Sequence, residues 1–138
     1  FNFQREKKGL KVISVEEAKK KCINILKEKK ILALLGDRDF TQNGIKIDFF
    51  NKQTLFPLGP AIFSLRTGAP IVPAFMIRKH KDYFLLKFEK PVYPVRKNSL
   101  EESIKELILQ YKGIFEKYVQ QYPEQWYMFR KFWIEEQK

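Results

Sequence analysis

The chain has 138 residues, of which 44% are apolar and 15% aromatic; this is enough for one domain with a hydrophobic core, and it excludes both two ordinary domains and general disorder. A formal net charge of +11 makes nucleic acid a partner to consider, although lysine and glutamate are mixed along the chain and form no basic block. The single cysteine, Cys22, excludes an internal disulfide and a cysteine-rich metal site, and no apolar run approaches the roughly 20 residues of a membrane-spanning helix.

The first quarter of the sequence predicts a strand, a helix and a second strand. Residues 12–13 end a short strand, and Ser14 with Glu17 forms a capping box at the start of an amphipathic helix. Cys22 falls on the apolar stripe of that helix and is expected to be a core thiol. The continuous apolar run at residues 31–35 predicts a strand that is covered on both faces.

The middle of the chain predicts a strand, a short helix and a hairpin. Residues 45–50 alternate between apolar and polar side chains, which is typical of a half-exposed strand. Pro60 at a first helical position and Gly68 just past the end bracket a short helix over residues 61–67. Two further strands are expected at residues 71–77 and 83–88, joined by a polar loop at residues 78–82.

The last part predicts a long helix and an aromatic-rich tail. Ser99 with Glu102 forms a second capping box, and Tyr122 with the following proline ends the long helix. Residues 124–133 predict a final helical segment. Four aromatic residues are expected to share one helical face: Tyr122, Trp126, Phe129 and Trp133. This face is expected either to pack on the sheet or to anchor at a lipid interface. The order of strands and helices predicts an α/β fold in a single domain, residues 1–138.

The sharpest chemical feature is Gly36-Asp37-Arg38-Asp39, directly after the expected buried strand. Open α/β sheets place their sites at the carboxyl ends of strands, and arginine binds phosphate through paired hydrogen bonds. The alternative is a turn whose acids cap the next element and pair with the arginine. His80 lies among lysines in a predicted loop, so we expect a solvated histidine and not a catalytic base.

Five short motifs follow one another along the chain. They are Leu34-Leu35-Gly36-Asp37-Arg38-Asp39, Asp48-Phe49-Phe50, Pro57-Leu58-Gly59-Pro60-Ala61, Thr67-Gly68-Ala69-Pro70-Ile71-Val72-Pro73 and Pro123-Glu124-Gln125-Trp126-Tyr127-Met128-Phe129. In this order they resemble the bacterial lipid A biosynthesis acyltransferases and the related phosphatidylinositol mannoside acyltransferases. The resemblance covers nearly the whole chain but only about the C-terminal half of a typical member, and the chain begins at Phe1; we therefore expect the C-terminal part of an acyltransferase domain.

The resemblance implies a glycerolipid-acyltransferase-like α/β fold, a mixed sheet flanked by helices, at the cytoplasmic face of the bacterial inner membrane. It implies transfer of a fatty acyl chain from an acyl carrier protein thioester to a hydroxyl of a membrane glycolipid such as a lipid A precursor, with no cofactor and no metal. Family members use the histidine of a His-x-x-x-x-Asp/Glu motif as the base. That motif is absent from this sequence, because the fifth residue after His80 is Leu85; we expect it upstream and expect this chain alone to be inactive.

By the same resemblance, five residues are expected to bind the acceptor: Arg5, Asp37, Arg38, Gly59 and Pro60. Asp37 and Arg38 would shape the acceptor pocket, with Arg38 holding phosphate or polarising an oxygen, and Arg5 would grip an anionic group. Gly59 and Pro60 would open a short helix whose N-terminal N–H groups suit an anion; the alternative is that these two residues only mark the turn and the start of the helix.

The identity of the acceptor and two other functions stay open. Asn51 stands where the family usually has glycine, and Met128 is closer to the mannoside enzymes than to the lipid A enzymes. A pI of about 9.7 motivates a nucleic-acid-binding module, although we expect no nucleic acid because the lysines are scattered and no binding motif is recognised. The other alternative is a non-catalytic domain that lies on a lipid surface. The expected partners are acyl carrier protein, a glycolipid and the membrane surface.

Overall fold

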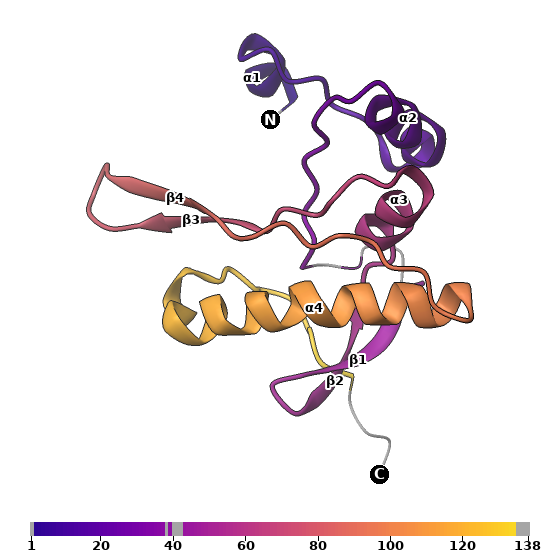
Figure 1. The fold of residues 1–138 in the computed structure, drawn as a ribbon. Coiled ribbons are helices and arrows are strands. Elements are labelled where there is room, and N and C mark those ends of the chain that lie inside the picture. Colours follow the sequence, from indigo (N-terminus) through magenta and orange to yellow (C-terminus); the bar gives the residue numbers. More distant parts are fainter. Residues whose placement is uncertain (1, 38, 40–42, 135–138) are drawn as a thin grey trace. The chain divides into compact units, whose positions relative to one another are not determined.

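The computed structural model describes residues 2–37, 39 and 43–134, without the side chains of Asn2 and Glu16. The chain forms two compact units, Phe1–Ala33 and Leu34–Lys138, which are described separately. The α/β class is confirmed, because helices are combined with small antiparallel sheets (Figure 1).

The N-terminal unit contains the helices α1 (Asn2–Lys7) and α2 (Val15–Lys27). Ser14 is the N-cap of α2 as predicted, but its hydroxyl donates to the Glu17 carboxylate at 3.3 Å and caps no backbone N–H. Cys22 is buried on α2 as expected, and burial raises the pKa of its thiol. The short strand predicted at residues 12–13 is wrong, because that segment has no strand partner.

The predicted buried strand at residues 31–35 is also wrong. The segment forms no strand, and Ile31 is 95% exposed. A strand needs a neighbouring strand that pairs with its backbone N–H and C=O groups. The strands that the structure describes pair as β1 with β2 and as β3 with β4, and neither of the two additional single bridges involves residues 31–35. The apolar composition of the run therefore did not fix its conformation.

The second unit begins with an antiparallel hairpin of β1 (Ile45–Phe49) and β2 (Lys52–Phe56). The two-residue loop, Phe50 and Asn51, has φ values of 52° and 60°, the left-handed pair that matches the twist of a hairpin. Asparagine tolerates this conformation, so the turn survives where the family usually has glycine. The strand β1 was predicted from its alternation, whereas β2, whose first residues are polar, was not predicted.

The helix α3 (Gly59–Thr67) starts two residues before its predicted beginning and ends as expected at Gly68, whose φ is +76°. A second antiparallel hairpin follows, formed by β3 (Ala74–Arg78) and β4 (Phe84–Phe88). The strand predicted from residue 71 starts only at Ala74. Ile71 makes a single bridge to Val92, because the prolines on either side of it cannot donate to a ladder.

The long helix α4 (Leu100–Gln121) is capped as predicted, since Ser99 accepts a hydrogen bond from the Glu102 N–H at 3.0 Å. The predicted final helix is wrong. Only the 3-10 turn η1 (Pro123–Gln125) forms, and the chain then continues without regular secondary structure to a bridge between Trp133 and Thr54 of β2. Pairing with the edge of β2 outweighs the local preference of this segment for helix, and the four aromatic residues therefore share no helical face.

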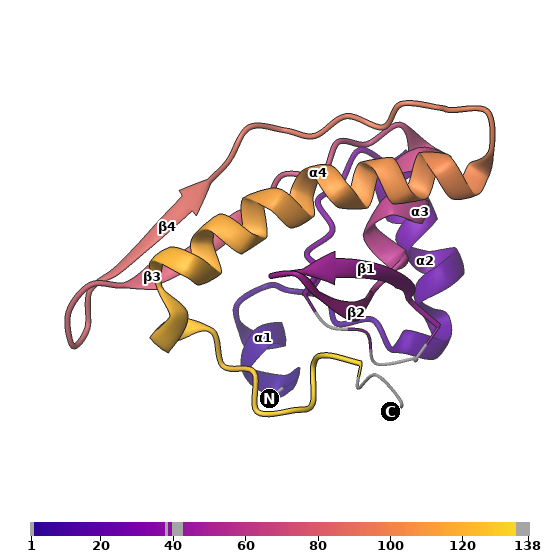
Figure 2. The same ribbon diagram turned by 90° about the horizontal axis from the view of Figure 1, so that it is seen from below.

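The core of the second unit lies between the β1–β2 hairpin, α3 and α4 (Figures 1 and 2). Phe49 and Phe56 are fully buried, and the Phe49 ring lies within 4.7–5.7 Å of five other aromatic rings. The Glu116 carboxylate of α4 accepts the Phe50 N–H at 2.9 Å and pairs with Lys112 at 2.9 Å, which fixes the hairpin turn on α4. The Asp48-Phe49-Phe50 motif thus builds the fold.

Candidate functional site

Asp37 is half-buried and is tied to the aromatic core. The Trp126 indole N–H donates to its Oδ2 at 3.4 Å. The Trp126 ring packs edge-on against Phe132 and Phe115, with centroid distances of 4.9 and 5.8 Å. Trp126 of the tail motif therefore contacts Asp37 directly. The helix predicted for the tail did not suggest this contact.

Asp39 lies at the open end of the β1–β2 hairpin. Its Oδ2 accepts the Gly44 N–H at 2.7 Å. A Cβ on Gly44 would lie 2.8 Å from that carboxylate oxygen and would overlap the backbone oxygen of Phe56. The close approach requires glycine, and it places Asp39 next to the end of β2, where the chain leaves for α3.

Gly59 and Pro60 form the first turn of α3. This turn has no acidic residue, and the N-cap residue Leu58 has no side chain that could accept a backbone N–H. The positive end of the helix dipole is therefore uncompensated within the helix itself, which suits an anionic oxygen. Asp37, Gly59 and Pro60 belong to one compact unit, and Asp39 lies beside Gly44 and the end of β2 in the same unit.

The two predicted arginines cannot be placed at this turn. Arg38 lies outside the described residues. Arg5 is an exposed residue in the last turn of α1, in the N-terminal unit, and its carbonyl oxygen accepts the N–H groups of Lys8 and Leu10 at 3.0 and 3.1 Å. The role of both arginines stays a prediction.

Two tyrosines of α4 carry raised pKa values. The Tyr118 hydroxyl donates to the Glu89 carboxylate, and this hydrogen bond, followed by burial, raises the pKa of Tyr118 to about 12. The Tyr111 hydroxyl is buried without a hydrogen-bond partner among the described residues, and burial raises its pKa. Both phenols are neutral at physiological pH and are not suited to act as bases.

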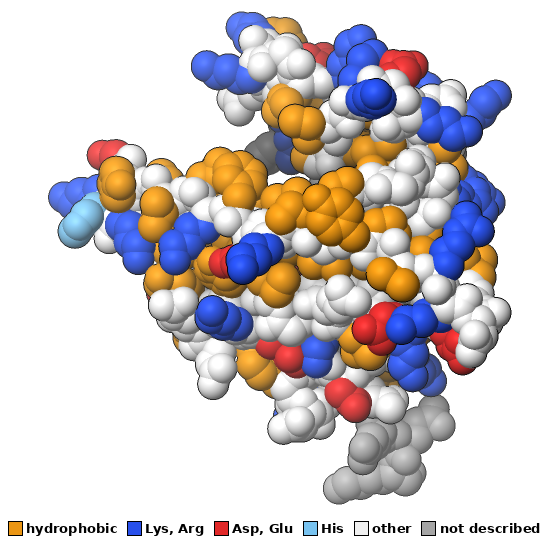
Figure 3. Space-filling view, viewed as in Figure 1, with side chains coloured by type: hydrophobic (Ala, Val, Ile, Leu, Met, Phe, Trp, Pro, Cys, Tyr) orange, Lys and Arg blue, Asp and Glu red, His pale blue; other side chains and the backbone are white. Residues whose placement is uncertain are grey.

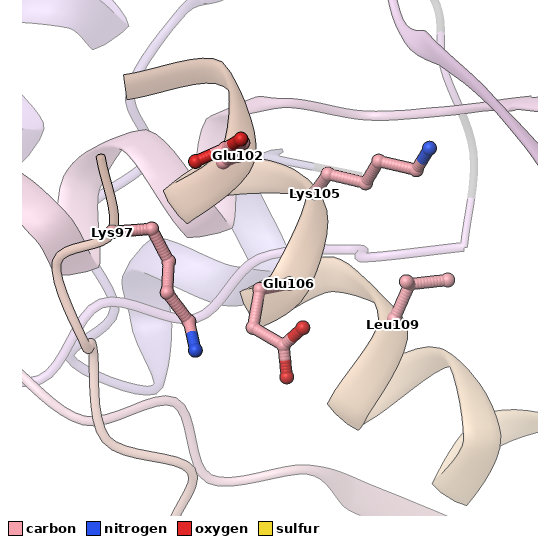
Figure 4. Close-up of a pocket in the computed structure, with 5 residues that line it drawn as sticks. All are labelled: Lys97, Glu102, Lys105, Glu106 and Leu109. Carbon is pink, nitrogen blue, oxygen red and sulfur yellow. The ribbon is translucent and has the colours of Figure 1, made fainter. Parts of the chain in front are cut away.

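A surface hollow of about 290 Å³ lies beside the first half of α4 (Figure 4). Two lysines, two glutamates and one leucine line it: Lys97, Glu102, Lys105, Glu106 and Leu109. The balanced charges select neither anions nor cations, and none of the sequence-predicted site residues is among them. Within residues 2–37, 39 and 43–134, no helix is long and apolar enough to cross a membrane, and no group of histidine, cysteine and acidic side chains could hold a metal ion.

Residues 1–135 match the family of bacterial lipid A biosynthesis acyltransferases, and the chain belongs to this family. It is 32% identical over 73 residues to the phosphatidylinositol mannoside acyltransferase of Mycobacterium tuberculosis, an alignment that covers 50% of this chain and 23% of the relative. It is 25% identical over 137 residues to the enzyme of that name from Mycolicibacterium smegmatis, covering 94% of this chain and 42% of the relative. The chain therefore spans less than half the length of these curated relatives. The resemblance stated from the five motifs is confirmed.

Proposed function

We propose that the chain is the C-terminal part of an enzyme that transfers a fatty acyl chain to a hydroxyl of a membrane glycolipid. The observation that carries this proposal is the family match over residues 1–135, nearly the whole chain. The names of both relatives favour a mannosylated phosphatidylinositol acceptor over a lipid A precursor, and Met128 of the tail motif points the same way. The proposed site of action is the cytoplasmic face of the bacterial inner membrane.

In the proposed reaction, the acceptor hydroxyl oxygen attacks the carbonyl carbon of a thioester carried by acyl carrier protein. An ester C–O bond forms, the C–S bond breaks, and the thiol leaves with the proton that the hydroxyl gives up. The proposed base is the histidine of the family's His-x-x-x-x-Asp/Glu motif, which this sequence does not contain. His80 is exposed in the loop between β3 and β4, with no acid five residues on, and is left out of the chemistry.

The proposed acceptor site comprises Asp37, Arg38 and the first turn of α3, with Gly59 and Pro60. The N–H group of Gly59 would receive an anionic oxygen of the acceptor headgroup, because Pro60 has no N–H and Ala61 is fully buried. Asp37, held by Trp126, would accept a hydrogen bond from a sugar hydroxyl. Arg38, next to Asp37 in sequence, would neutralise the acceptor phosphate.

The test is an acyl-transfer assay with the full-length gene product, an acyl carrier protein thioester, and either phosphatidylinositol mannoside or a lipid A precursor. We expect an ester product with the mannoside. Asp37→Asn should raise KM for the acceptor about tenfold, the effect of one hydrogen bond to a charged group, while the control Asp48→Asn, on the exposed side of β1, should leave it unchanged.

His80→Ala is the matched test of where the base lies. It should leave kcat unaltered, because His80 is exposed in a loop. A collapse of kcat in this variant would show that the base has been misplaced. Absence of transfer to either acceptor by a folded full-length protein would contradict the proposed reaction.

A further inference from the structure

The two faces of the β3–β4 hairpin have different surroundings. One face carries Phe75 and Ile77 and packs on the second half of α4. The Phe75 ring stacks on Tyr118 with a centroid distance of 3.7 Å and an interplanar angle of 6°, and Ile77 is buried. The other face is turned away from α4 and defines what we call the apolar hairpin face.

The apolar hairpin face exposes large apolar side chains on both strands. Met76 of β3 lies opposite Leu86 of β4, and Phe84 and Phe88 lie on the same side of the sheet. Their exposed fractions are 65% for Met76, 49% for Leu86, 49% for Phe84 and 68% for Phe88. A contiguous exposed patch of this kind is unfavourable in water and marks an interaction surface.

Side-chain hydrogen bonds attach both ends of the β3–β4 hairpin to the end of α4 and to η1. The Gln125 side chain bonds to both backbone groups of Arg78, accepting its N–H at 2.7 Å and donating to its carbonyl oxygen at 3.1 Å. At the other end, Glu89 accepts the hydrogen bond from Tyr118. Both attachments use the end of α4 and η1, so the orientation of the hairpin on its own unit is fixed.

Positive charge borders the face. Residues 74–90 contain five basic side chains (Arg78, Lys79, Lys81, Lys87 and Lys90) against the two acids Asp82 and Glu89, a net charge of +3 without the histidine. Lys79 and Lys87 lie on the side of α4, against the rings of Tyr122 and Tyr118, so the loop cations Arg78 and Lys81 are the ones beside the apolar residues. The Arg78 guanidinium lies 5.5 Å from the centre of the Phe84 ring, at the border between the cationic loop and the apolar residues. Figure 3 shows hydrophobic side chains gathered over the hairpin with lysine and arginine beside them.

We propose that the apolar hairpin face docks on the surface of an anionic lipid bilayer. Its apolar side chains enter the boundary between headgroups and acyl chains, and Arg78 and Lys81 at the loop contact lipid phosphates. A second copy of the chain fits poorly, because it would bring an equal net positive charge against this one. This proposal identifies the surface by which the protein would contact the membrane of the proposed function. It is based on the exposure and charge of the hairpin and does not depend on acyl transfer.

Vesicle flotation with the full-length protein tests the inference. The vesicles contain phosphatidylcholine alone or phosphatidylcholine mixed with phosphatidylglycerol. The double variant Leu86→Ser/Phe88→Ser should partition into mixed vesicles about tenfold or more weakly than the unchanged protein, because two apolar side chains no longer enter the boundary. Leu100→Ser/Leu109→Ser, which alters two exposed leucines of α4, is the matched control and should partition like the unchanged protein.

The charge contribution is tested separately. Lys81→Gln should weaken partitioning into the phosphatidylglycerol mixture by about fivefold and leave binding to phosphatidylcholine alone nearly unchanged. Lys87→Gln, on the face toward α4, is the matched control and should partition nearly like the unchanged protein. Equal partitioning of the Leu86→Ser/Phe88→Ser variant and the unchanged protein would overturn the inference.

A fluorescent probe separates lipid from a protein partner. An environment-sensitive label on Leu86→Cys should emit as in water in buffer and shift to the blue when mixed vesicles are added. Emission that is already shifted in buffer would show that another segment of the polypeptide or a second copy covers the face, and would overturn the inference. Vesicle binding without acyl transfer would leave the inference standing and count against the proposed function alone.

Discussion

The two hairpins of the second unit have the same size and opposite environments. Both are antiparallel pairs of two five-residue strands. In β1–β2, Phe49 and Phe56 are fully buried, and the extended tail adds a bridge at Thr54. In β3–β4, Phe84 and Phe88 remain largely exposed. The aromatic residues of β1–β2 are therefore part of the hydrophobic core, whereas Phe84 and Phe88 of β3–β4 are part of the surface.

The difference teaches that the apolar content of a strand does not fix what covers it. The β1–β2 hairpin is enclosed by α3, α4 and the tail, so its aromatic residues stabilise the fold. The β3–β4 hairpin packs on α4 through one face only, and the basic residues around its loop favour an anionic partner for the other face.

The largest expected effect is on the buried hairpin. Phe49→Ala should lower the free energy of unfolding by about 3–5 kcal/mol, because it leaves a cavity among five aromatic rings. Phe88→Ala, on the exposed hairpin, should change it by less than about 0.5 kcal/mol. Equilibrium unfolding in urea compares the two, and equal losses would contradict the contrast between the hairpins.

An intermediate effect is expected at the open end of β1–β2. Gly44→Ala should cost about 1–3 kcal/mol, because the added Cβ overlaps the backbone of Phe56, which the strand holds in place. Gly113→Ala is the matched control: no atom would meet its Cβ, and alanine in the middle of α4 should stabilise by up to about 1 kcal/mol. Thermal unfolding should show a lower melting temperature for Gly44→Ala and an equal or higher one for Gly113→Ala than for the unchanged protein.

The smallest effect concerns the attachment of β3–β4 to α4. The Glu89 carboxylate raises the pKa of Tyr118 to about 12, above the usual value near 10, so the folded state favours the neutral phenol. This stabilisation is complete below about pH 10 and is lost as the pH rises through about 12. The difference in unfolding free energy between the unchanged protein and Tyr118→Phe should shrink over that range, and a difference independent of pH would contradict the assigned hydrogen bond.

Elements with a local signal were predictable from the sequence. Ser99 before Glu102, Gly68 after α3 and the alternation in β1 each encode a boundary or a face within a few residues, and the structure follows them. The family was predictable as well, because the order of five motifs is a property of the sequence alone.

Elements that depend on distant partners were not predictable. Residues 31–35 have the composition of a strand but pair with none of the strands that the structure describes. Residues 124–133 have helical spacing, but the end of this segment, Trp133, bridges to Thr54 of β2. At the candidate site, Asp37 was identified from its motif, whereas its bond to Trp126 spans 89 positions of sequence and needed the fold to appear. The exposure of the β3–β4 face is likewise a tertiary property.

The most direct measurement combines partitioning and stability for one variant, Phe88→Ser of the full-length protein. Its partition coefficient into vesicles that contain phosphatidylglycerol and its free energy of unfolding are measured on the same preparation. We predict a fall in partitioning of about tenfold with a change in unfolding free energy below about 0.5 kcal/mol. Unchanged partitioning, or a loss of stability as large as that of Phe49→Ala, would contradict the assignment of β3–β4 as a lipid-facing surface.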